Sequence, residues 1–248
     1  MKETDAALAR RLAVAAGRLL MELRDNEDTN AKALGAEGDR AANRLILDEL
    51  RRARPDDAIL SEEEAADPAR LASRRIWIID PLDGTREYGE RRDDWAVHVG
   101  LAIDGVAAEG AVSLPAMNAC FCTATPPALA PENRPLRMLV SRTRPAREAT
   151  EVAASLGAEL VTMGSAGAKA MAIVRGQADI YLHSGGQYEW DSCAPVAVAL
   201  AHGLHCSRID GSPLIYNQAD VYMPDLLICR QEHAARVLAE VAGLEPLA

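Results

Sequence analysis

Two aspartates separated by a proline and a leucine form the motif of this chain best suited to chemistry. Residues 80–85 read Asp-Pro-Leu-Asp-Gly-Thr and follow a short apolar run. Pro81 has no N–H and should take the chain out of a sheet, and Gly84 allows a close turn, so both carboxylates can face one small volume. Two like charges this close repel each other, and one stays protonated unless a cation lies between them. Asp80 and Asp83 therefore predict a divalent metal site.

Further carboxylates follow two other places in the chain where an apolar stretch or loop should end. Residues 61–64 read Ser-Glu-Glu-Glu, and residues 189–191 read Glu-Trp-Asp, with Asp191 as the expected N-cap of a helix. Oxygen ligands favour Mg²⁺ or Mn²⁺ over zinc, which prefers nitrogen and sulfur, and the nearest histidine in sequence is His98. A pair of such ions can clamp the attacking and leaving oxygens of a phosphoryl group.

Each acidic motif also has a purely structural interpretation. Asp80 and Asp83 could be turn formers, Asp191 a helix cap, and the glutamate run a solvated loop. Their joint occurrence, with a Gly-Thr pair beside one of them, favours a metal site over three separate explanations.

Composition and charge narrow the classes of function. Of the 248 residues, 49% are hydrophobic and 4% aromatic, and the net charge is −10. These values are typical of a globular protein with a sizeable core and disfavour binding to polymeric nucleic acid. Charges interrupt residues 1–23, no apolar run is long enough to span a bilayer, and the five cysteines form no Cys-x-x-Cys pair. We therefore expect no integral membrane segment and a reducing, cytoplasmic location.

The elements that must position these residues fall into two groups. Four prolines within 125–135 predict a boundary between an N-terminal half, 1–130, and a C-terminal half, 131–248. Helices are predicted over 4–23, 39–52, 148–156, 166–175, 191–201 and 234–241. Strands are predicted over 58–60, 76–79, 95–103, 106–112, 121–124, 136–141, 160–162, 179–182 and 226–229. The alternation of strands and helices in the second half is typical of an α/β protein.

Three motifs resemble, in order and spacing, the signatures of the inositol monophosphatase-like superfamily of metal-dependent phosphatases. They are residues 60–63 (Leu-Ser-Glu-Glu), 77–85 (Trp-Ile-Ile-Asp-Pro-Leu-Asp-Gly-Thr) and 190–195 (Trp-Asp-Ser-Cys-Ala-Pro). The resemblance implies the layered αβαβα sugar-phosphatase fold, of α/β (α+β) class. Relatives in this superfamily are often dimers, so a homodimer is expected.

Within the superfamily, residues 86–88 (Arg-Glu-Tyr) resemble the continuation of the motif in 3′(2′),5′-bisphosphate nucleotidases of the CysQ type, and 92–98 and 185–191 look like their actinobacterial members. This implies hydrolysis of the 3′-phosphate of 3′-phosphoadenosine 5′-phosphate to AMP in sulfate assimilation, which could extend to 3′-phosphoadenosine 5′-phosphosulfate. Inositol monophosphate and fructose 1,6-bisphosphate stay open as alternative substrates.

The resemblance also implies a ligand set for two or three Mg²⁺ ions, with Mn²⁺ as a substitute. Glu62, Asp80 and the backbone carbonyl of Leu82 would hold one ion. Asp80 would share a second ion with Asp83 and Asp191. These cations would let an acidic protein accept a polyanionic nucleotide, because they reverse the local potential.

The catalytic roles carried over from the family fall on residues beside these ligands. Gly84 and Thr85 would present backbone N–H groups to the phosphate. Thr85 with Asp39 would orient and deprotonate a water activated by the metals, with Glu62 contributing to the same step. That water would attack phosphorus in line, with no phosphoenzyme.

The substrate side is implied more weakly. Ser165 and Lys169 stand where related nucleotidases contact the phosphate that is not cleaved, although a solvated helix lysine is an equal alternative for Lys169. Gln187 and Glu189, within 185–189, would line the sugar or base.

Other classes fit the motifs less well. In haloacid dehalogenase-type phosphatases the two aspartates are two residues apart and the first is a nucleophile, whereas here they are three apart. A calcium-binding loop that begins at Asp80 lacks ligands at its third and fifth positions. A non-catalytic metal or nucleotide sensor stays open. Arg70, Arg74 and Arg75 are expected on the solvated surface.

Overall fold

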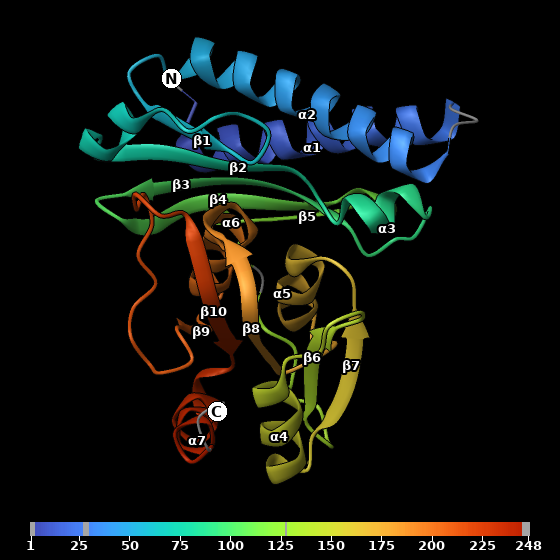
Figure 1. The fold of residues 1–248 in the computed structure, drawn as a ribbon, viewed down its shortest axis with the longest axis vertical. Helices are drawn as coiled ribbons and strands as arrows, with labels where there is room; N and C mark the ends of the chain where they lie inside the picture. The colour runs from blue at the N-terminus through green and yellow to red at the C-terminus, as the bar shows by residue number, and fades with distance from the viewer. Residues whose placement is uncertain (1–2, 27–29, 127, 245–248) are drawn as a thin grey trace.

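Two five-stranded sheets and three layers of helices alternate through the molecule (Figure 1). The computed structural model describes residues 3–26, 30–126 and 128–244. The outer layer is α1 (Asp5–Asn26) with α2 (Ala31–Ala53), the middle layer α5 (Ala166–Val174) with α6 (Glu189–Ala201), and the last layer α4 (Arg147–Leu156) with α7 (Gln231–Ala242). This order confirms the expected αβαβα fold of mixed α/β class.

The first sheet lies under α1 and α2. Its strands are, in spatial order, β1 (Ala58–Ser61), β2 (Arg75–Asp83), β3 (Ala96–Ile103), β4 (Val106–Leu114) and β5 (Ala119–Cys122). Only β1 and β2 are parallel, and the other neighbours are antiparallel. Trp77 and Ile79 pack toward the α1 and α2 layer, while Ile76 and Ile78 pack toward α5 and α6. Burial on both faces explains why β2 is continuously apolar.

The second sheet is mixed. Its strands are, in spatial order, β7 (Glu159–Met163), β6 (Arg137–Ser141), β8 (Ile180–Tyr188), β10 (Tyr222–Cys229) and β9 (His205–Ser207). Strand β6 is parallel to β7 and β8, whereas β10 is antiparallel to β8 and β9. The sequence did not predict β9, because three residues are too short for a periodic pattern.

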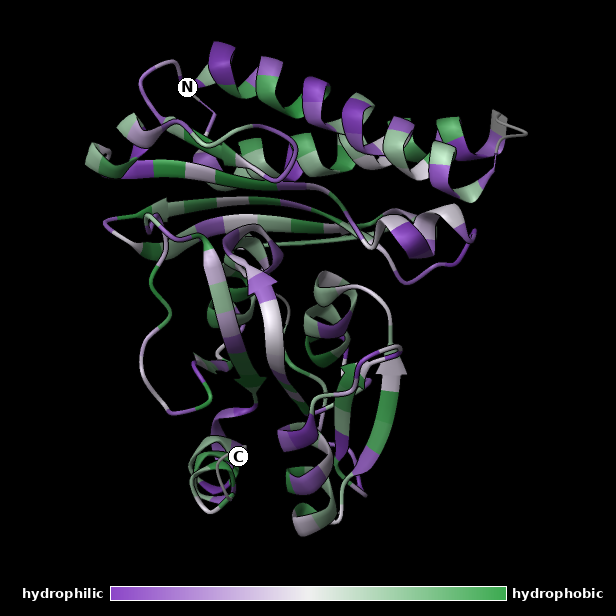
Figure 2. Ribbon diagram, viewed as in Figure 1, coloured by the Kyte–Doolittle hydropathy of each residue, from purple (hydrophilic) through white to green (hydrophobic). Residues whose placement is uncertain are grey.

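Three hydrophobic clusters fill the spaces between the five layers. Figure 2 shows the matching pattern on α2, with hydrophilic residues outward and hydrophobic residues toward the sheet. In the described part of the chain, no helix combines the length and the apolar character needed to cross a bilayer. Segment 125–135 connects β5 to β6, and residue 127 within it lies outside the described residues. The division into halves at residue 130 stays a prediction.

Helix α2 starts well before the predicted residue 39. Asn30 caps it, accepting a hydrogen bond from an N–H of the first turn. Gly35 and Gly38 weakened the helical pattern, because glycine has low helix propensity. They are needed for close packing: a Cβ at Gly35 would lie 2.6 Å from the Cγ2 of Thr85. This approach brings Asp39, on the same helix, to the end of β2.

Strand β2 does not end at Pro81 as predicted. Asp80 pairs with His98 and Asp83 pairs with Ala96, with an irregularity in the register between them. Proline is tolerated in such a bulge because its missing N–H is not required by the ladder. The chain leaves the sheet at Gly84, whose φ of 89° is in the left-handed region, and the short helix α3 (Thr85–Gly89) follows.

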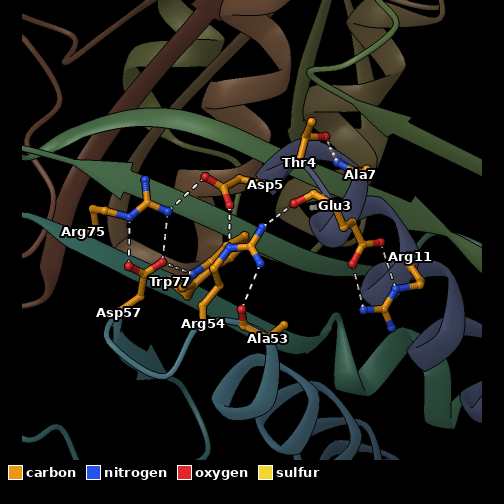
Figure 3. A network of polar contacts seen from close by, with 10 residues as sticks. All are labelled: Glu3, Thr4, Asp5, Ala7, Arg11, Ala53, Arg54, Asp57, Arg75 and Trp77. Carbon is orange, nitrogen blue, oxygen red and sulfur yellow. Dashed lines mark hydrogen bonds and ion pairs between the residues drawn. The ribbon is translucent and has the colours of Figure 1, made fainter. Parts of the chain in front are cut away.

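An ion-pair network joins the beginning of β2 to α1 and to the end of α2 (Figure 3). Asp5 accepts hydrogen bonds from Arg54 at 2.7 Å and from Arg75 at 2.9 Å. Arg75 also donates to Asp57 at 2.8 Å, and the Trp77 indole donates to the same carboxylate at 2.9 Å. Burial opposes charge on both aspartates, but the hydrogen bonds from the arginines outweigh it and lower the pKa of Asp5 and of Asp57.

Candidate active site

Three carboxylates from two distant parts of the sequence meet at the end of β2. Asp80, Asp83 and Asp191 each offer an oxygen atom, and these atoms lie within 4.8 Å of one another. Asp191 is not the N-cap of α6, as predicted, but the third residue of the first turn. Tyr188 is the cap, and its backbone N–H donates to the Asp191 carboxylate at 2.6 Å.

Glu62 completes this group, hereafter the acidic cluster of Glu62, Asp80, Asp83 and Asp191. It follows β1, and because β1 runs parallel to β2, both strands deliver their carboxylates to the same edge of the sheet. Glu62 is exposed at the surface, but desolvation of its carboxylate, then repulsion from Asp191, raises its pKa to about 7. Burial and Asp83 raise the pKa of Asp191 to about 6, and burial with Glu62 raises that of Asp80 well above its usual value.

The donor atoms of the acidic cluster suit a hard divalent cation. All four side chains are carboxylates, and the carbonyl oxygen of Leu82, between Asp80 and Asp83 in the chain, accepts a hydrogen bond from the hydroxyl of Thr85 at 3.2 Å. Carboxylates that raise one another's pKa values lack a compensating charge, and a bound cation supplies it. Oxygen-only donors are those that Mg²⁺ and Mn²⁺ take.

Asp83 has a different environment from the other members of the cluster. One oxygen accepts a hydrogen bond from the N–H of Ala166 at 3.2 Å, and the other from the N–H of Gly167 at 2.6 Å. Nε2 of His98 lies 3.1 Å from the second oxygen. Burial opposes ionisation, but the histidine and these amides outweigh it and lower the pKa of Asp83.

Asp39 and Thr85 form a pair next to the acidic cluster. The Thr85 hydroxyl donates to Asp39 Oδ2 at 3.0 Å. Burial, with repulsion from Glu63, raises the pKa of Asp39 to about 7. Within the described residues, Oδ1 of Asp39 has no hydrogen-bond partner. The pair therefore offers a hydroxyl oxygen that is hydrogen-bonded to a carboxylate whose pKa is close to neutral pH.

A cavity of about 320 Å³ opens beside Asp83 and Asp191 of the acidic cluster, whereas Glu62 and Asp80 are not among its lining residues. Asp83, Asp191 and Thr85 line one side. Four basic side chains from α3, the β6–α4 loop and α5 also line the cavity and are hereafter called the basic wall: Arg86, Arg142, Arg144 and Lys169. A cavity lined both by carboxylates and by basic side chains can hold cations and an additional anionic group together.

Comparison with known proteins identifies the family. The inositol monophosphatase family model matches residues 1–244. The chain belongs to this family. The inositol monophosphatase family is metal-dependent, in keeping with the acidic cluster.

Curated relatives share much of the sequence. The chain is 50% identical over 253 residues to the 3′-phosphoadenosine 5′-phosphate phosphatase of Mycobacterium leprae, covering 96% of this chain and 93% of that protein. It is 32% identical over 197 residues to the 3′(2′),5′-bisphosphate nucleotidase CysQ of Escherichia coli, covering 75% and 80%.

Solved structures share the fold. CysQ from Bacteroides thetaiotaomicron superposes with a TM-score of 0.79 at 23% identity, covering 92% of this chain and 98% of that chain. The inositol monophosphatase from Anabaena gives a TM-score of 0.77 at 22% identity, covering 98% and 96%.

Lys169 is buried in this member of the family and is not a solvated helix lysine. Its side chain turns back along α5, and Nζ donates to the carbonyls of Gly164 at 2.6 Å and Ser165 at 2.8 Å. Burial lowers its pKa to about 8, against the attraction of Asp83 and Asp191. Ser165 caps α5, accepting from a first-turn N–H. Both residues line the cavity.

The two residues expected on the sugar or base side are in different places. Gln187 lines the cavity, and its amide donates to the Tyr181 hydroxyl at 2.9 Å. Glu189 is not among the lining residues. Glu189 is the first residue of α6, beyond the end of β8, and its carboxylate is bonded to residues 217 and 218 instead. We therefore leave Glu189 out of the proposed substrate contacts.

The carboxylate of Glu189 has a structural role at the start of α6. Its two oxygens accept from the backbone N–H groups of Asn217 and Gln218, each at 2.7 Å. Arg70 holds the same segment, donating to the Asn217 side chain at 2.7 Å and to the Gln218 carbonyl at 2.8 Å. Arg70 is 4% exposed, so its expected place on the solvated surface is wrong.

Sequence reasoning did not predict that Arg142 and Arg144 line the cavity. Arg142 and Arg144 come from residues 141–144 (Ser-Arg-Thr-Arg), directly after β6. Arg142 also pairs with Glu87 at 2.7 Å and with Glu90 at 3.0 Å, which ties this loop to α3. Two arginines directly after a strand were the available signal.

Proposed function

We propose that the protein is a Mg²⁺-dependent phosphatase that removes the 3′-phosphate of 3′-phosphoadenosine 5′-phosphate and leaves AMP. The observation that carries the proposal is a cavity lined both by carboxylates of the acidic cluster and by the basic wall. A bisphosphorylated nucleotide needs both kinds of side chain, because one phosphate must reach the cations that the carboxylates hold and the other needs a basic partner. The relative that shares 50% identity bears the name of this activity.

The acidic cluster holds the ions in this proposal. Glu62, Asp80 and the carbonyl of Leu82 provide one set of oxygens, and Asp83 and Asp191 extend it to a second ion. Bound Mg²⁺ lowers the pKa of a coordinated water and offsets the charge of the phosphoryl group. The identity of the ion rests on the oxygen-only donor set.

In this proposal Asp39 and Thr85 take up the proton of the attacking water. Because the Thr85 hydroxyl donates to Asp39, its oxygen is free to accept a hydrogen bond from the attacking water. The proton can then pass through the hydroxyl to Asp39, whose pKa of about 7 suits a base at neutral pH. Gly84 and Thr85 present backbone N–H groups to the phosphate, and no covalent phosphoenzyme is required.

Lys169 is the proposed partner of the uncleaved phosphate. Two of its three N–H donors are used on backbone carbonyls, which leaves one for an anion in the cavity. Ser165 and Gln187 line the same space. We place the reaction in cytoplasmic sulfate assimilation, in keeping with five cysteines that are all free thiols in the described structure. A homodimer stays a prediction.

Phosphate release tests the proposal. kcat/KM should be measured with Mg²⁺ for 3′-phosphoadenosine 5′-phosphate, inositol 1-phosphate and fructose 1,6-bisphosphate, with Asp83→Asn as the inactive variant. Asp104→Asn, on the exposed β3–β4 turn, is the matched control. We expect a preference for the nucleotide that Asp83→Asn abolishes and Asp104→Asn leaves unchanged.

Each other outcome has a defined meaning. Preference for either sugar phosphate would keep the metal chemistry and reject the nucleotide as substrate. If no substrate releases phosphate while the nucleotide binds, the protein is a sensor instead. A phosphorylated aspartate trapped during turnover would reject direct attack by water.

A further inference from the structure

His98 contacts two of the three chain segments that carry the acidic cluster, the end of β2 and the start of α6. It lies on β3, and its side chain is 0% exposed. Nδ1 lies 3.0 Å from the carbonyl oxygen of Trp190, the residue next to Asp191. Nε2, on the opposite edge of the ring, lies 3.1 Å from Oδ2 of Asp83. One rigid ring thus spans the gap between the end of β2 and the first turn of α6.

The ring has a closely fitted slot. A Cβ at Gly167 would lie 2.1 Å from Nε2 of His98, so α5 can approach only because residue 167 has no side chain. From this position the Gly167 N–H donates to the same oxygen of Asp83 that faces the ring. The side chain of Asp83 is therefore fixed by β3 and by α5 together.

We propose that His98 is a positioning residue that sets the distance between Asp83 and Asp191 and thereby the affinity for divalent metal. The inference rests on the metal site of the proposed function. Like charges on Asp83 and Asp191 push the two elements apart when no cation is bound. A rigid planar ring packed between the Trp190 carbonyl and the Asp83 carboxylate keeps these two groups at a fixed separation and resists that displacement. Residues that orient metal ligands typically affect metal affinity by about 10–100-fold when replaced.

A buried histidine can also be an ordinary core residue, and His202 shows what that looks like in this chain. Its Nδ1 lies 2.7 Å from the Val198 carbonyl of its own helix, α6. His202 is 8% exposed and contacts no member of the acidic cluster in the described structure. It is therefore a control of matched size and burial for replacement of His98.

The experiment separates the two edges of the ring. His98→Asn keeps an amide N–H near the position of Nδ1, and His98→Gln places one near the position of Nε2. Mn²⁺ binding should be measured without substrate by electron paramagnetic resonance, together with the Mg²⁺ concentration for half-maximal activity. We expect both His98 variants to weaken Mn²⁺ binding by about 10–100-fold. His202→Asn should bind Mn²⁺ within about twofold of wild type, and activity of the His98 variants should recover in part at high Mg²⁺.

Several results would overturn the inference. It is wrong if folded His98 variants bind Mn²⁺ as wild type does, or if His202→Asn weakens binding equally. If the His98 variants do not fold, the wild-type protein carries the test through its imidazole NMR signals. Mg²⁺ should then shift the signals of His98 and leave those of His202 in place, and equal shifts at both or at neither reject the proposal.

The metal measurement also separates this inference from the proposed activity. Weakened Mn²⁺ binding in the His98 variants, with no phosphate release from the nucleotide by wild type, would keep the positioning role and reject the substrate. Normal Mn²⁺ binding in the variants, with phosphate release by wild type, would do the reverse.

Discussion

At the beginning of β2, Arg75 pairs with Asp57 and Asp5, whereas at its end Asp80 lies among other carboxylates of the acidic cluster. Both places lie at an end of β2, and both contain aspartate carboxylates. At the first, arginines lower the pKa of each aspartate. At the second, burial and neighbouring carboxylates raise the pKa of Asp80.

This contrast shows how one strand serves stability and function separately. The ion-pair network is satisfied within the folded chain, so it can contribute to the free energy of unfolding at neutral pH. The acidic cluster is not satisfied without an added cation, so it costs stability and creates a binding site. Changes at the two ends of β2 should therefore have opposite effects on stability and activity.

The largest effect is expected from neutralising Asp80, the most buried carboxylate of the acidic cluster. Asp80→Asn keeps the oxygen that accepts from the Leu82 N–H at 3.0 Å but removes a ligand charge. We expect kcat to fall by about 10³-fold or more, because stabilisation by metal amounts to several kcal/mol. The Tm of the metal-free variant should rise, because one repelling charge is gone.

Asp83→Asn gives the matching contrast. Both oxygens of Asp83 accept from backbone N–H groups of α5, so an amide NH₂ must face a donor. Activity should be lost equally, but the metal-free Tm should fall. Calorimetry in excess chelator tests this pair, and a shared direction of change would contradict the electrostatic account.

The next effect concerns metal and pH. Glu62 and Asp191 have pKa values raised to about 7 and about 6. A raised folded pKa stabilises fully below the unfolded value of about 4, and this contribution is lost as pH rises through 6 to 7. Asp5 has a lowered pKa, so its contribution is present above about pH 4 and is lost as pH falls further. The metal-free protein should therefore be most stable near about pH 5.

Mg²⁺ should offset the repulsion that develops above this pH. At 100 times Kd it stabilises by about 3 kcal/mol, which raises Tm by about 6–10 °C in a chain of this size. The rise should be larger at pH 8 than at pH 5, because the ligands must be deprotonated to bind. Scanning fluorimetry with and without chelator measures it, and an equal rise at both pH values would contradict the prediction.

A smaller effect is expected at the other end of β2. The Arg54 side chain is 10% exposed and bonds to Asp5 and to the Glu3 carbonyl. Arg54→Met leaves a half-buried carboxylate with fewer donors and should lower the unfolding free energy by about 1–2 kcal/mol. kcat should not change, since Arg54 does not line the cavity. Urea denaturation with parallel assays checks both, and a loss of kcat would show that the two ends are coupled.

The smallest effect should come from Arg74, beside the network but exposed. It pairs with Asp104 at 2.7 Å, with side chains 80% and 54% exposed. Solvent screens such a pair, so Arg74→Gln should leave Tm within experimental error of wild type. A measurable drop in Tm would mean that the exposed fraction of a side chain does not predict how much its charge contributes to stability on this face.

Local patterns predicted most of the fold. The hairpin of β3 and β4 turns at Asp104 and Gly105, as a two-residue turn signal indicates. The carboxylates of β1 and β2 were also predictable, because each follows its own apolar strand. The start of α2 was not predictable, because Gly35 and Gly38 have low helix propensity. They are present because α2 packs closely against α3 and Leu20.

The basic wall of the cavity was not predictable in the same way. Arg86, Arg142 and Lys169 come from separate elements, and their proximity depends on how the second sheet packs under α5. Arg70 was expected in solvent and is buried, because its partners are far along the chain at Asn217 and Gln218. No local pattern signals partners so distant in sequence. The roles assigned to individual site residues stay predictions.

Residues 208–221, which Arg70 and Glu189 hold from two sides, contain no helix or strand. A connection of this length normally exchanges its amide hydrogens first. Here the Asn217 and Gln218 amides are bonded to a carboxylate that is 1% exposed, and the Tyr216 amide is bonded to the Gly105 carbonyl. These three amides should exchange as slowly as neighbouring strands, so the turn of α6 that carries Asp191 keeps a fixed boundary during turnover.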